Sequence, residues 1–275
     1  MFDLARKMLF TAMVAGCAAP TFAADMLEPM VVEPPPAYEP APAPVEFGGW
    51  YIRGDIDYHK PNWRGADYIT YGGPAIGGSK SFDSGELKGA FSLGGGVGYQ
   101  INRYLRTDVT ADYWFKSKFN GSTSCVGGCA STDESKMSAL LLLANAYADL
   151  GTWNRITPYV GVGIGGAHVK WGDLTNTIGG FGQAHKGTKN WRFAYALMAG
   201  ASYCVTDRVA LDAGYRFSHI EGGRMFEYNG AGPGFDKGFN THEVRAGLRY
   251  SLGGSANGCS EPPPVAYEPE PIYTK

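Results

Sequence analysis

Apolar and polar residues alternate with a period of two over most of the chain between residues 48 and 252. In the first such segment, Trp50 and Ile52 fall on one face and Arg53 and Asp55 on the other. Side chains of a β-strand point alternately to its two faces, so this pattern predicts strands with one apolar and one polar face. We predict eight strands, at residues 50–58, 91–100, 105–115, 138–150, 158–171, 191–203, 209–218 and 242–252. The strands at 138–150, 158–171 and 191–203 are less regular, and the alternation in 158–171 slips in phase near Gly166.

The connections between these strands alternate in length. Three are short, at residues 102–103, 151–155 and 206–208, and four are long and polar or glycine-rich, at residues 59–88, 116–136, 172–190 and 220–240. A soluble β-sandwich can show the same alternation within a strand, but it has no reason to separate long from short connections so regularly. Short turns at one end and long loops at the other are typical of outer-membrane barrels.

The apolar face carries aromatic residues near its ends. They are Trp50, Tyr58, Tyr99, Tyr113, Trp171, Trp191, Tyr203 and Tyr250. In a membrane barrel they would form the two interfacial girdles, and strands of about 9–11 residues match the bilayer thickness. A soluble barrel would turn its apolar face inward. We therefore predict an all-β fold, an eight-stranded antiparallel transmembrane β-barrel with short periplasmic turns and long extracellular loops.

The polar face is predicted to line the lumen of this barrel. Its charged residues are Arg53, Asp55, Asp57, Arg106, Asp108, Asp112, Asp149, Arg192, Asp212, Arg216, Glu243, Arg245 and Arg249. The nearly balanced signs indicate interlocked ion pairs, because an uncompensated buried charge is costly. An eight-stranded barrel is just wide enough for its own side chains to fill it. We therefore favour a filled lumen, with a conducting pore as the alternative.

The N-terminal residues 1–23 have the features of a secretory signal. Arg6 and Lys7 precede an apolar stretch too short to span a bilayer, and small residues at the −3 and −1 positions favour cleavage after Ala23. Cys17 lies in a sequence that resembles a lipoprotein box. Acylation of Cys17 is the alternative to an ordinary cysteine within the apolar region of the signal.

Two proline-rich segments flank the predicted barrel. They are nearly identical in sequence, at residues 33–40 and 261–269, and such segments favour an extended polyproline II conformation. We assign residues 24–47 and 253–275 as periplasmic segments around a barrel at residues 48–252. Both ends of an even-stranded barrel emerge on the same side.

Composition narrows the possible functions. The chain has 40 glycines, 18% charged residues and a formal net charge of −2. A run of about 18 apolar residues, as a transmembrane helix needs, is absent from the sequence. Without a basic cluster, nothing indicates a nucleic-acid partner. We expect no cofactor and no metal site.

The cysteines are expected to meet an oxidising compartment during export, which favours disulfides. Cys125 and Cys129 lie in the second long loop and could close a small ring; metal binding by this pair is the weaker alternative. Cys204 ends the sixth strand and Cys259 lies in the C-terminal tail. A bond between these two would tether the tail to the barrel, and two free thiols are the alternative.

Several segments resemble the alphaproteobacterial outer-membrane surface-antigen barrels, porin-family relatives of the OmpA transmembrane domain. The matching segments are residues 48–55, 96–102, 145–151, 157–161 and 214–217. The resemblance implies an outer-membrane barrel surrounded by outer-membrane lipid and lipopolysaccharide. The last strand also resembles the signal read by the barrel-assembly machinery, with Arg245, Gly247, Tyr250 and Leu252 at its pattern positions, although 23 residues follow it.

Members of this family with a mature Ala-Asp terminus can be joined to peptidoglycan, and Ala24-Asp25 fits that pattern. We therefore expect a structural and surface protein that supports envelope integrity, with attachment through Ala24 as a hypothesis. A small-solute porin is the alternative. An outer-membrane lipid hydrolase using Ser218, His219 and Glu221 is disfavoured, because adjacent strand residues point to opposite faces, so we expect no enzyme.

Overall fold

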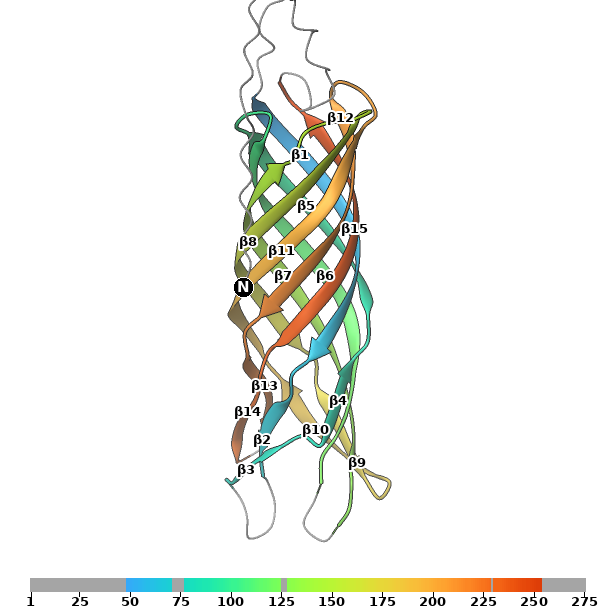
Figure 1. The fold of residues 1–275 in the computed structure, drawn as a ribbon. Coiled ribbons are helices and arrows are strands. Elements are labelled where there is room, and N and C mark those ends of the chain that lie inside the picture. Colours follow the sequence, from blue (N-terminus) through green and yellow to red (C-terminus); the bar gives the residue numbers. More distant parts are fainter. Residues whose placement is uncertain (1–47, 71–76, 125–127, 229, 254–275) are drawn as a thin grey trace, which may run out of the picture. The chain divides into compact units, whose positions relative to one another are not determined.

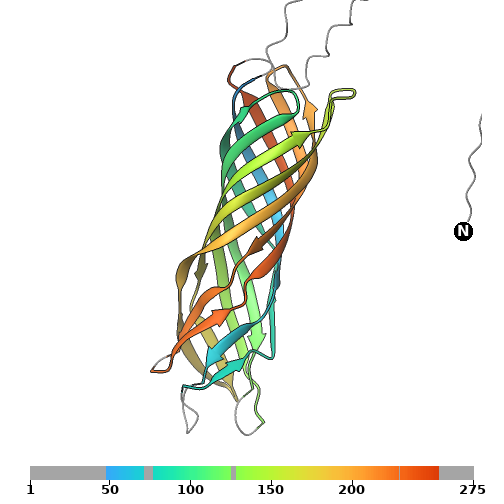
Figure 2. The ribbon, with the colours of Figure 1, turned by 60° about the vertical axis from the view of Figure 1, so that its left-hand side comes forward.

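The computed structural model describes residues 48–70, 77–124, 128–228 and 230–253. Eight long antiparallel strands form a closed barrel, because β1 pairs with both β5 and β15 (Figures 1 and 2). In order around the barrel they are β1 (Gly49–Trp63), β5 (Ala90–Gln100), β6 (Leu105–Ser122), β7 (Thr132–Asp149), β8 (Ile156–Trp171), β11 (Lys189–Cys204), β12 (Val209–Ile220) and β15 (Phe239–Ser251). The predicted eight-stranded antiparallel barrel is confirmed.

Short connections join the strands at one end of the barrel, here named the turn end. They run through residues 101–104, 150–155 and 205–208. None of the helices in the described part of the chain is long and apolar enough to cross a membrane.

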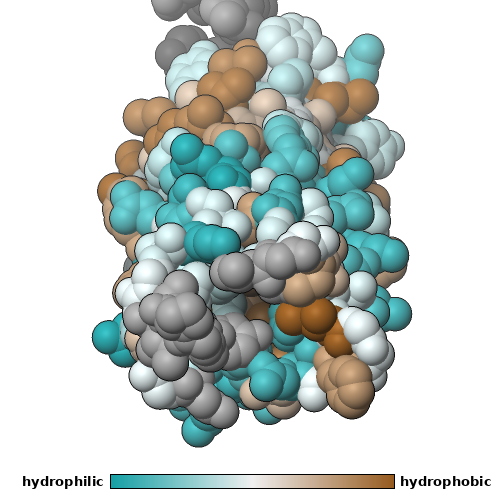
Figure 3. All heavy atoms as spheres, turned by 90° about the horizontal axis from the view of Figure 1, so that it is seen from below, coloured by the Kyte–Doolittle hydropathy of each residue, from teal (hydrophilic) through white to brown (hydrophobic). Residues whose placement is uncertain are grey.

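The opposite end differs from the polar loops that the sequence led us to expect. Much of the long connections folds into seven short strands, which we name the crown: β2 (Ala66–Ile69), β3 (Ser79–Ser81), β4 (Ser84–Leu87), β9 (Leu174–Ile178), β10 (Phe181–Gly187), β13 (Gly223–Tyr228) and β14 (Gly232–Asp236). Six of these strands pair with one another in the order β3-β2-β14-β13-β10-β9. In addition, β9 pairs with the barrel strand β7, and β4 pairs with the barrel strand β6. The crown therefore extends the barrel wall, and its end face is largely hydrophilic (Figure 3).

The barrel strands are accordingly longer than expected from the bilayer alone; β6 and β7 have 18 residues each. Alternate residues are buried and exposed along most of their length, as the period-two pattern predicts, although the alternation shifts at an irregularity on β6 between Trp114 and Ser117. On β5, the inward positions Gly94 and Gly96 have no side chain. A Cβ at Gly94 would lie 2.1 Å from the carboxylate of Asp112 on β6, so glycine at this position leaves room for the charge.

The phase slip expected near Gly166 is wrong. Along β8, Gly163, Ala167 and Trp171 all remain on the inward, buried side. What changes is the chemistry of the two faces: beyond Gly166 the inward residues become apolar, and the outward ones become polar, as at Lys170. Such a change is expected where a strand passes out of the bilayer, because an apolar interior and a polar exterior are then favoured while the strand geometry stays regular.

Trp171, expected in an interfacial girdle, is therefore an interior residue with 2% of its surface exposed. The other seven aromatic residues of that prediction lie on the outer face with large exposed fractions. Trp171 packs at 5.5 Å from Phe119 and 5.6 Å from Phe226, between ring centroids, inside the crown half of the barrel. Trp171 thus belongs to a second interior layer, which the alternation in the sequence does not reveal.

Candidate functional site

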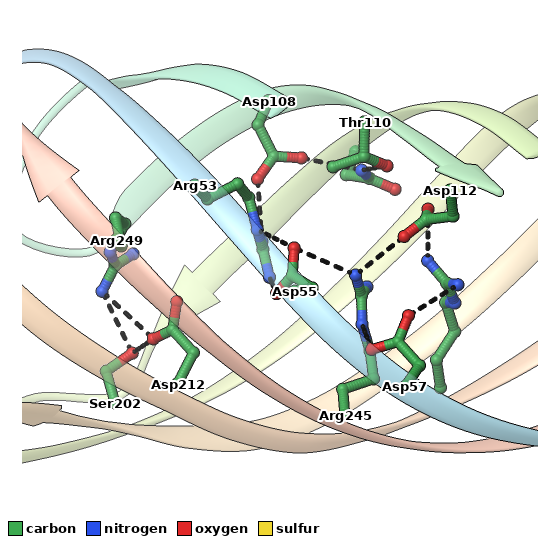
Figure 4. A network of polar contacts seen from close by, with 12 residues as sticks. Arg53, Asp55, Asp57, Asp108, Thr110, Asp112, Ser202, Asp212, Arg245 and Arg249 are labelled. Atoms are coloured by element: carbon green, nitrogen blue, oxygen red, sulfur yellow. Dashed lines mark hydrogen bonds and ion pairs between the residues drawn. The ribbon is translucent and has the colours of Figure 1, made fainter. Parts of the chain in front are cut away.

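All thirteen charged residues predicted to line the lumen are buried there, and none exposes more than 7% of its surface. They come from six of the eight barrel strands, with β5 and β8 contributing none. Because each side chain alternates inward with the pleat, distant segments bring opposite charges together across the narrow interior. Figure 4 shows the central part of this network.

Arg53 on β1 forms the turn-side part of the network. Its guanidinium donates to Asp55 on the same strand at 2.7 Å and to Asp108 on β6 at 3.0 Å. Asp108 also accepts hydrogen bonds from Tyr51 at 3.1 Å and from Asn145 at 2.7 Å. The carboxylate is thus held by donors from β1 and β7, which satisfy a charge that burial would otherwise penalise.

Arg245 on β15 connects this group to the next one. It lies 3.3 Å from Asp55, 3.1 Å from Asp57 and 3.3 Å from Asp112 (Figure 4). One guanidinium therefore joins carboxylates from β1 and β6. The charges form a continuous network rather than a series of separate pairs.

Arg216 on β12 forms the next group toward the crown. It donates to Asp112 at 2.9 Å and to Glu243 at 2.6 Å, and it lies 3.5 Å from Asp57. Glu243 also accepts a hydrogen bond from Ser218 at 2.8 Å. Arg216 and Glu243 are both fully buried, so the group is sealed from water by the residues around it.

Two further ion pairs lie close to the turn end. Arg106 bonds to Asp149 at 3.0 Å, and its guanidinium lies 4.2 Å and 4.6 Å from the ring centroids of Tyr147 and Tyr159. Cation–π contact of this kind stabilises a desolvated guanidinium.

The second of these pairs joins β12 and β15. Arg249 lies 3.5 Å from Asp212 and donates to Ser202 at 3.0 Å. The lumen charges at this end of the barrel thus lie in ion pairs.

Arg192 finds its partner in the crown. It binds Asp236 on β14 with two hydrogen bonds, at 2.6 and 2.7 Å, and Asp236 also accepts from the indole of Trp171 at 3.2 Å. Burial raises the pKa of Asp236, although the Arg192 guanidinium acts to lower it. Sequence reasoning missed Asp236 because it lies within residues 220–240, which were taken to be a loop.

On the crown side of the charged network the interior is mainly apolar. The barrel half next to the crown contains a single cluster of buried residues that includes Trp114, Leu141, Ala167, Ile220 and Phe239, none exposing more than 2%. The cluster continues into the crown through other buried side chains, among them Tyr68, Leu174, Met225 and Tyr228. Such a layer is equivalent to the hydrophobic core of a soluble protein.

The other predicted sites lie apart from this interior. Tyr250 and Leu252 of the assembly pattern are on the outer face, whereas Arg245 points inward and Gly247 is half-buried in β15. Cys129 is exposed near the crown and Cys204 is buried at the end of β11. Their expected partners Cys125 and Cys259 lie outside the described residues, as do Cys17 and Ala24, so these hypotheses stay predictions.

The structure does not bring Ser218 and His219 together. Ser218 points inward to Glu243, whereas the imidazole of His219 points outward and contacts Asn240 at 2.6 Å. A nucleophile and base on opposite faces of one strand cannot act on one substrate. Within the described ranges, no group of three or more histidine, cysteine or acidic side chains is placed to hold a metal ion.

A family model for the outer membrane protein beta-barrel domain matches residues 9–251. The chain belongs to this family. An uncharacterised protein of Brucella suis biovar 1 is 37% identical over 289 residues, covering 90% of this chain and 99% of that protein. A candidate adhesin of Rickettsia conorii is 26% identical over 224 residues, covering 74% of this chain and 82% of the adhesin.

Among solved structures, the Neisserial surface protein A is 22% identical with a TM-score of 0.41, covering 75% of this chain and 100% of that one. The family membership confirms the resemblance to alphaproteobacterial outer-membrane barrels that the sequence suggested. The chain is thus an outer-membrane β-barrel protein of a Gram-negative bacterium.

Proposed function

We propose that this outer-membrane barrel is a non-conducting structural and surface protein that supports envelope integrity. In this proposal the crown faces the outside of the cell, and the turn end and both termini lie in the periplasm. The observation that carries it is the two-layered interior, with ion-paired residues toward the turn end and an apolar cluster toward the crown.

The burial of the lumen charges supports a filled barrel. A water-filled pore would leave its lining charges in contact with solvent, whereas here the thirteen expose at most 7% of their surface. An ion that entered would have to displace paired charges and then cross an apolar layer, where an unpaired charge is strongly penalised. Both layers oppose the alternative of a small-solute porin.

Planar-bilayer recording tests this part of the proposal. The full mature chain, folded into lipid and checked by its heat-modifiable gel mobility, is expected to give no defined conductance steps. Steady steps of uniform size would overturn the filled-barrel assignment in favour of the porin.

The envelope role is tested in cells. A deletion strain is expected to become more sensitive to detergent and to take up a normally excluded dye, and the wild-type gene should restore both phenotypes. Unchanged sensitivity would argue against a structural role.

The N-terminal processing belongs to the same proposal. We place signal cleavage after Ala23, leaving the amine of Ala24 available for linkage to peptidoglycan. Mass spectrometry of lysozyme-digested cell walls should then find a muropeptide joined to a fragment beginning at Ala24. A free or acylated N-terminus, the latter at Cys17, would contradict this attachment.

A second candidate function is adhesion through the crown. Phe181 lies beside the turn between β9 and β10 with 84% of its surface exposed, a large apolar side chain offered to solvent. The Rickettsia relative is described as a candidate adhesin. Replacing Phe181 by Ser should reduce attachment to host cells or matrix without altering the amount of surface protein, and unchanged attachment would remove Phe181 from this role.

A further inference from the structure

Seven exposed lysines lie on the outer face of the barrel, where the exposed apolar residues of that face end on the crown side. This group, named the lysine belt, is Lys60, Lys88, Lys116, Lys118, Lys136, Lys170 and Lys189. On their strands they follow the last outward aromatic residues closely: Lys60 lies two residues beyond Tyr58, and Lys116 is next to Phe115. The belt is therefore placed at the level of lipid headgroups.

Some of these lysines directly oppose one another. Lys118 on β6 pairs in register with Lys136 on β7, and Lys170 on β8 pairs with Lys189 on β11. Like charges in directly opposite positions destabilise a sheet. Within the described part of the chain, none of the seven lysines lies within ion-pair distance of a carboxylate; Lys237, outside this group, does.

Three members of the belt gather around one hollow. The backbone amide of Lys88 donates to the carbonyl of Lys118 at 2.9 Å, which places Lys88 beside the Lys118–Lys136 pair. These three residues, the lysine triad, line a surface hollow of about 650 Å³ together with Asn120 and Ser135. Glu134 and Asp173 also line it, leaving an excess of positive charge.

We propose that the lysine triad binds a phosphate group of lipid A in the outer leaflet. The ligand must be anionic where it meets the triad and apolar beside it, because outward aromatic residues such as Phe91 and Tyr113 continue the same surface into the bilayer. A phosphorylated glycolipid meets both conditions. The crown-outward orientation in the proposed function places the triad in the correct leaflet.

Phosphate recognition fits the chemistry of the triad. Lysine ammonium groups are mobile point charges that suit phosphate, and charge-assisted bonds to it are stronger than neutral ones. An anion between Lys118 and Lys136 would also remove their mutual repulsion. The lysines should therefore stabilise the barrel when lipid A is present and destabilise it slightly when lipid A is absent.

The test compares Lys118→Gln/Lys136→Gln with the charge-matched control Lys80→Gln/Lys186→Gln, whose exposed lysines lie on crown strands β3 and β10. The full mature chain is folded into phosphatidylcholine vesicles with or without bisphosphorylated lipid A, and urea midpoints and lipid A binding are measured. We expect lipid A to raise the midpoint of the wild type and the control, and to bind the triad variant roughly tenfold more weakly.

Without lipid A, the triad variant is expected to be at least as stable as the wild type, which also shows that it folds. Equal lipid A binding by all three proteins would overturn the proposal. So would equal stabilisation by phosphatidylglycerol vesicles of the same charge or by inorganic phosphate alone. A conducting barrel that still shows triad-dependent binding would overturn the proposed function but leave this site in place.

Discussion

At the scale of single residues, the stability of the interior depends on buried charges that are compensated only by one another. Arg216 contacts Asp112, Asp57 and Glu243, and all four are almost completely excluded from water. Replacing a whole buried ion network with apolar residues can be neutral, whereas removal of one member leaves its partners uncompensated. The sequence predicted these residues well because the period-two pattern fixes which side chains face inward.

Arg216→Met is therefore expected to lower the free energy of unfolding by about 3–5 kcal/mol. Urea unfolding in lipid vesicles, followed by tryptophan fluorescence, measures the change. Arg208→Met removes the same charge from an exposed turn residue and should change stability little. Equal effects of the two substitutions would show that the buried network is not what stabilises the barrel.

Glycines on β5 allow a second comparison. Gly94 and Gly95 are neighbours, but a Cβ at Gly94 would lie 2.1 Å from Asp112, whereas a Cβ at Gly95 would meet only the backbone oxygen of Arg53 at 3.5 Å. Gly94→Ala should destabilise the barrel by roughly 1–3 kcal/mol through overpacking, and Gly95→Ala should be close to neutral. The same unfolding assay would contradict this if the two variants behaved alike.

At the scale of elements, the strands were predictable where the bilayer imposes one pattern on them, and unpredictable beyond it. Outside the membrane, a barrel strand is stable with an apolar inner face and a polar outer face. This is the reverse of the pattern in its membrane-spanning part. Trp171 was therefore assigned to the wrong environment even though the strand containing it was found. The crown strands have only 3–7 residues each, too few for a pattern of alternation to be recognised.

The crown should respond to acid through His185. This residue of β10 is buried, with its ring centroid 4.7 Å from that of Tyr228, and burial lowers its pKa below the usual value of 6.5. A pKa that is lower in the folded state gives stability that is present above the unfolded pKa and lost as pH falls through the folded one. The crown should therefore open more readily in acid.

Limited proteolysis of the reconstituted protein measures this, with faster cleavage of the crown expected below about pH 6 than at neutrality. His185→Phe keeps an aromatic ring without the titrating group and should remove the acceleration. Burial raises the pKa of Asp133, which acts in the opposite direction, so its contribution is lost as pH rises. Identical acid profiles for wild type and His185→Phe would exclude His185 as the sensor.

At the scale of the whole molecule, the two ends of the barrel have different tasks in the proposed function. The crown is built from paired strands over an apolar core, so it can present a fixed surface. The described part of the chain begins and ends at the turn end, at Gly48 and Gly253, and we predict that the segments continuing from these residues reach the periplasm. These segments are predicted from the sequence, and the structure describes the barrel residues from which they continue.

A Cys204–Cys259 disulfide would fasten the C-terminal tail to the turn end. Peptide mapping of the exported protein without reduction should find this pair joined, and Cys125 joined to Cys129. Cys259→Ser should leave the barrel equally stable but make residues 253–275 more accessible to periplasmic protease. Tail cleavage at the wild-type rate would contradict a tether.

The reversal of pattern near Gly166 on β8, and near Trp114 on β6, also fixes how deeply the protein sits in the bilayer. A shift outward would bring lipid-facing residues such as Ile164 into water, and a shift inward would carry Lys170 into hydrocarbon. Either displacement raises the free energy of the protein in the bilayer, so the change of pattern on a wall strand favours one depth of insertion. Vertical position is thereby specified independently of any partner, and the crown begins at a set height above the membrane surface.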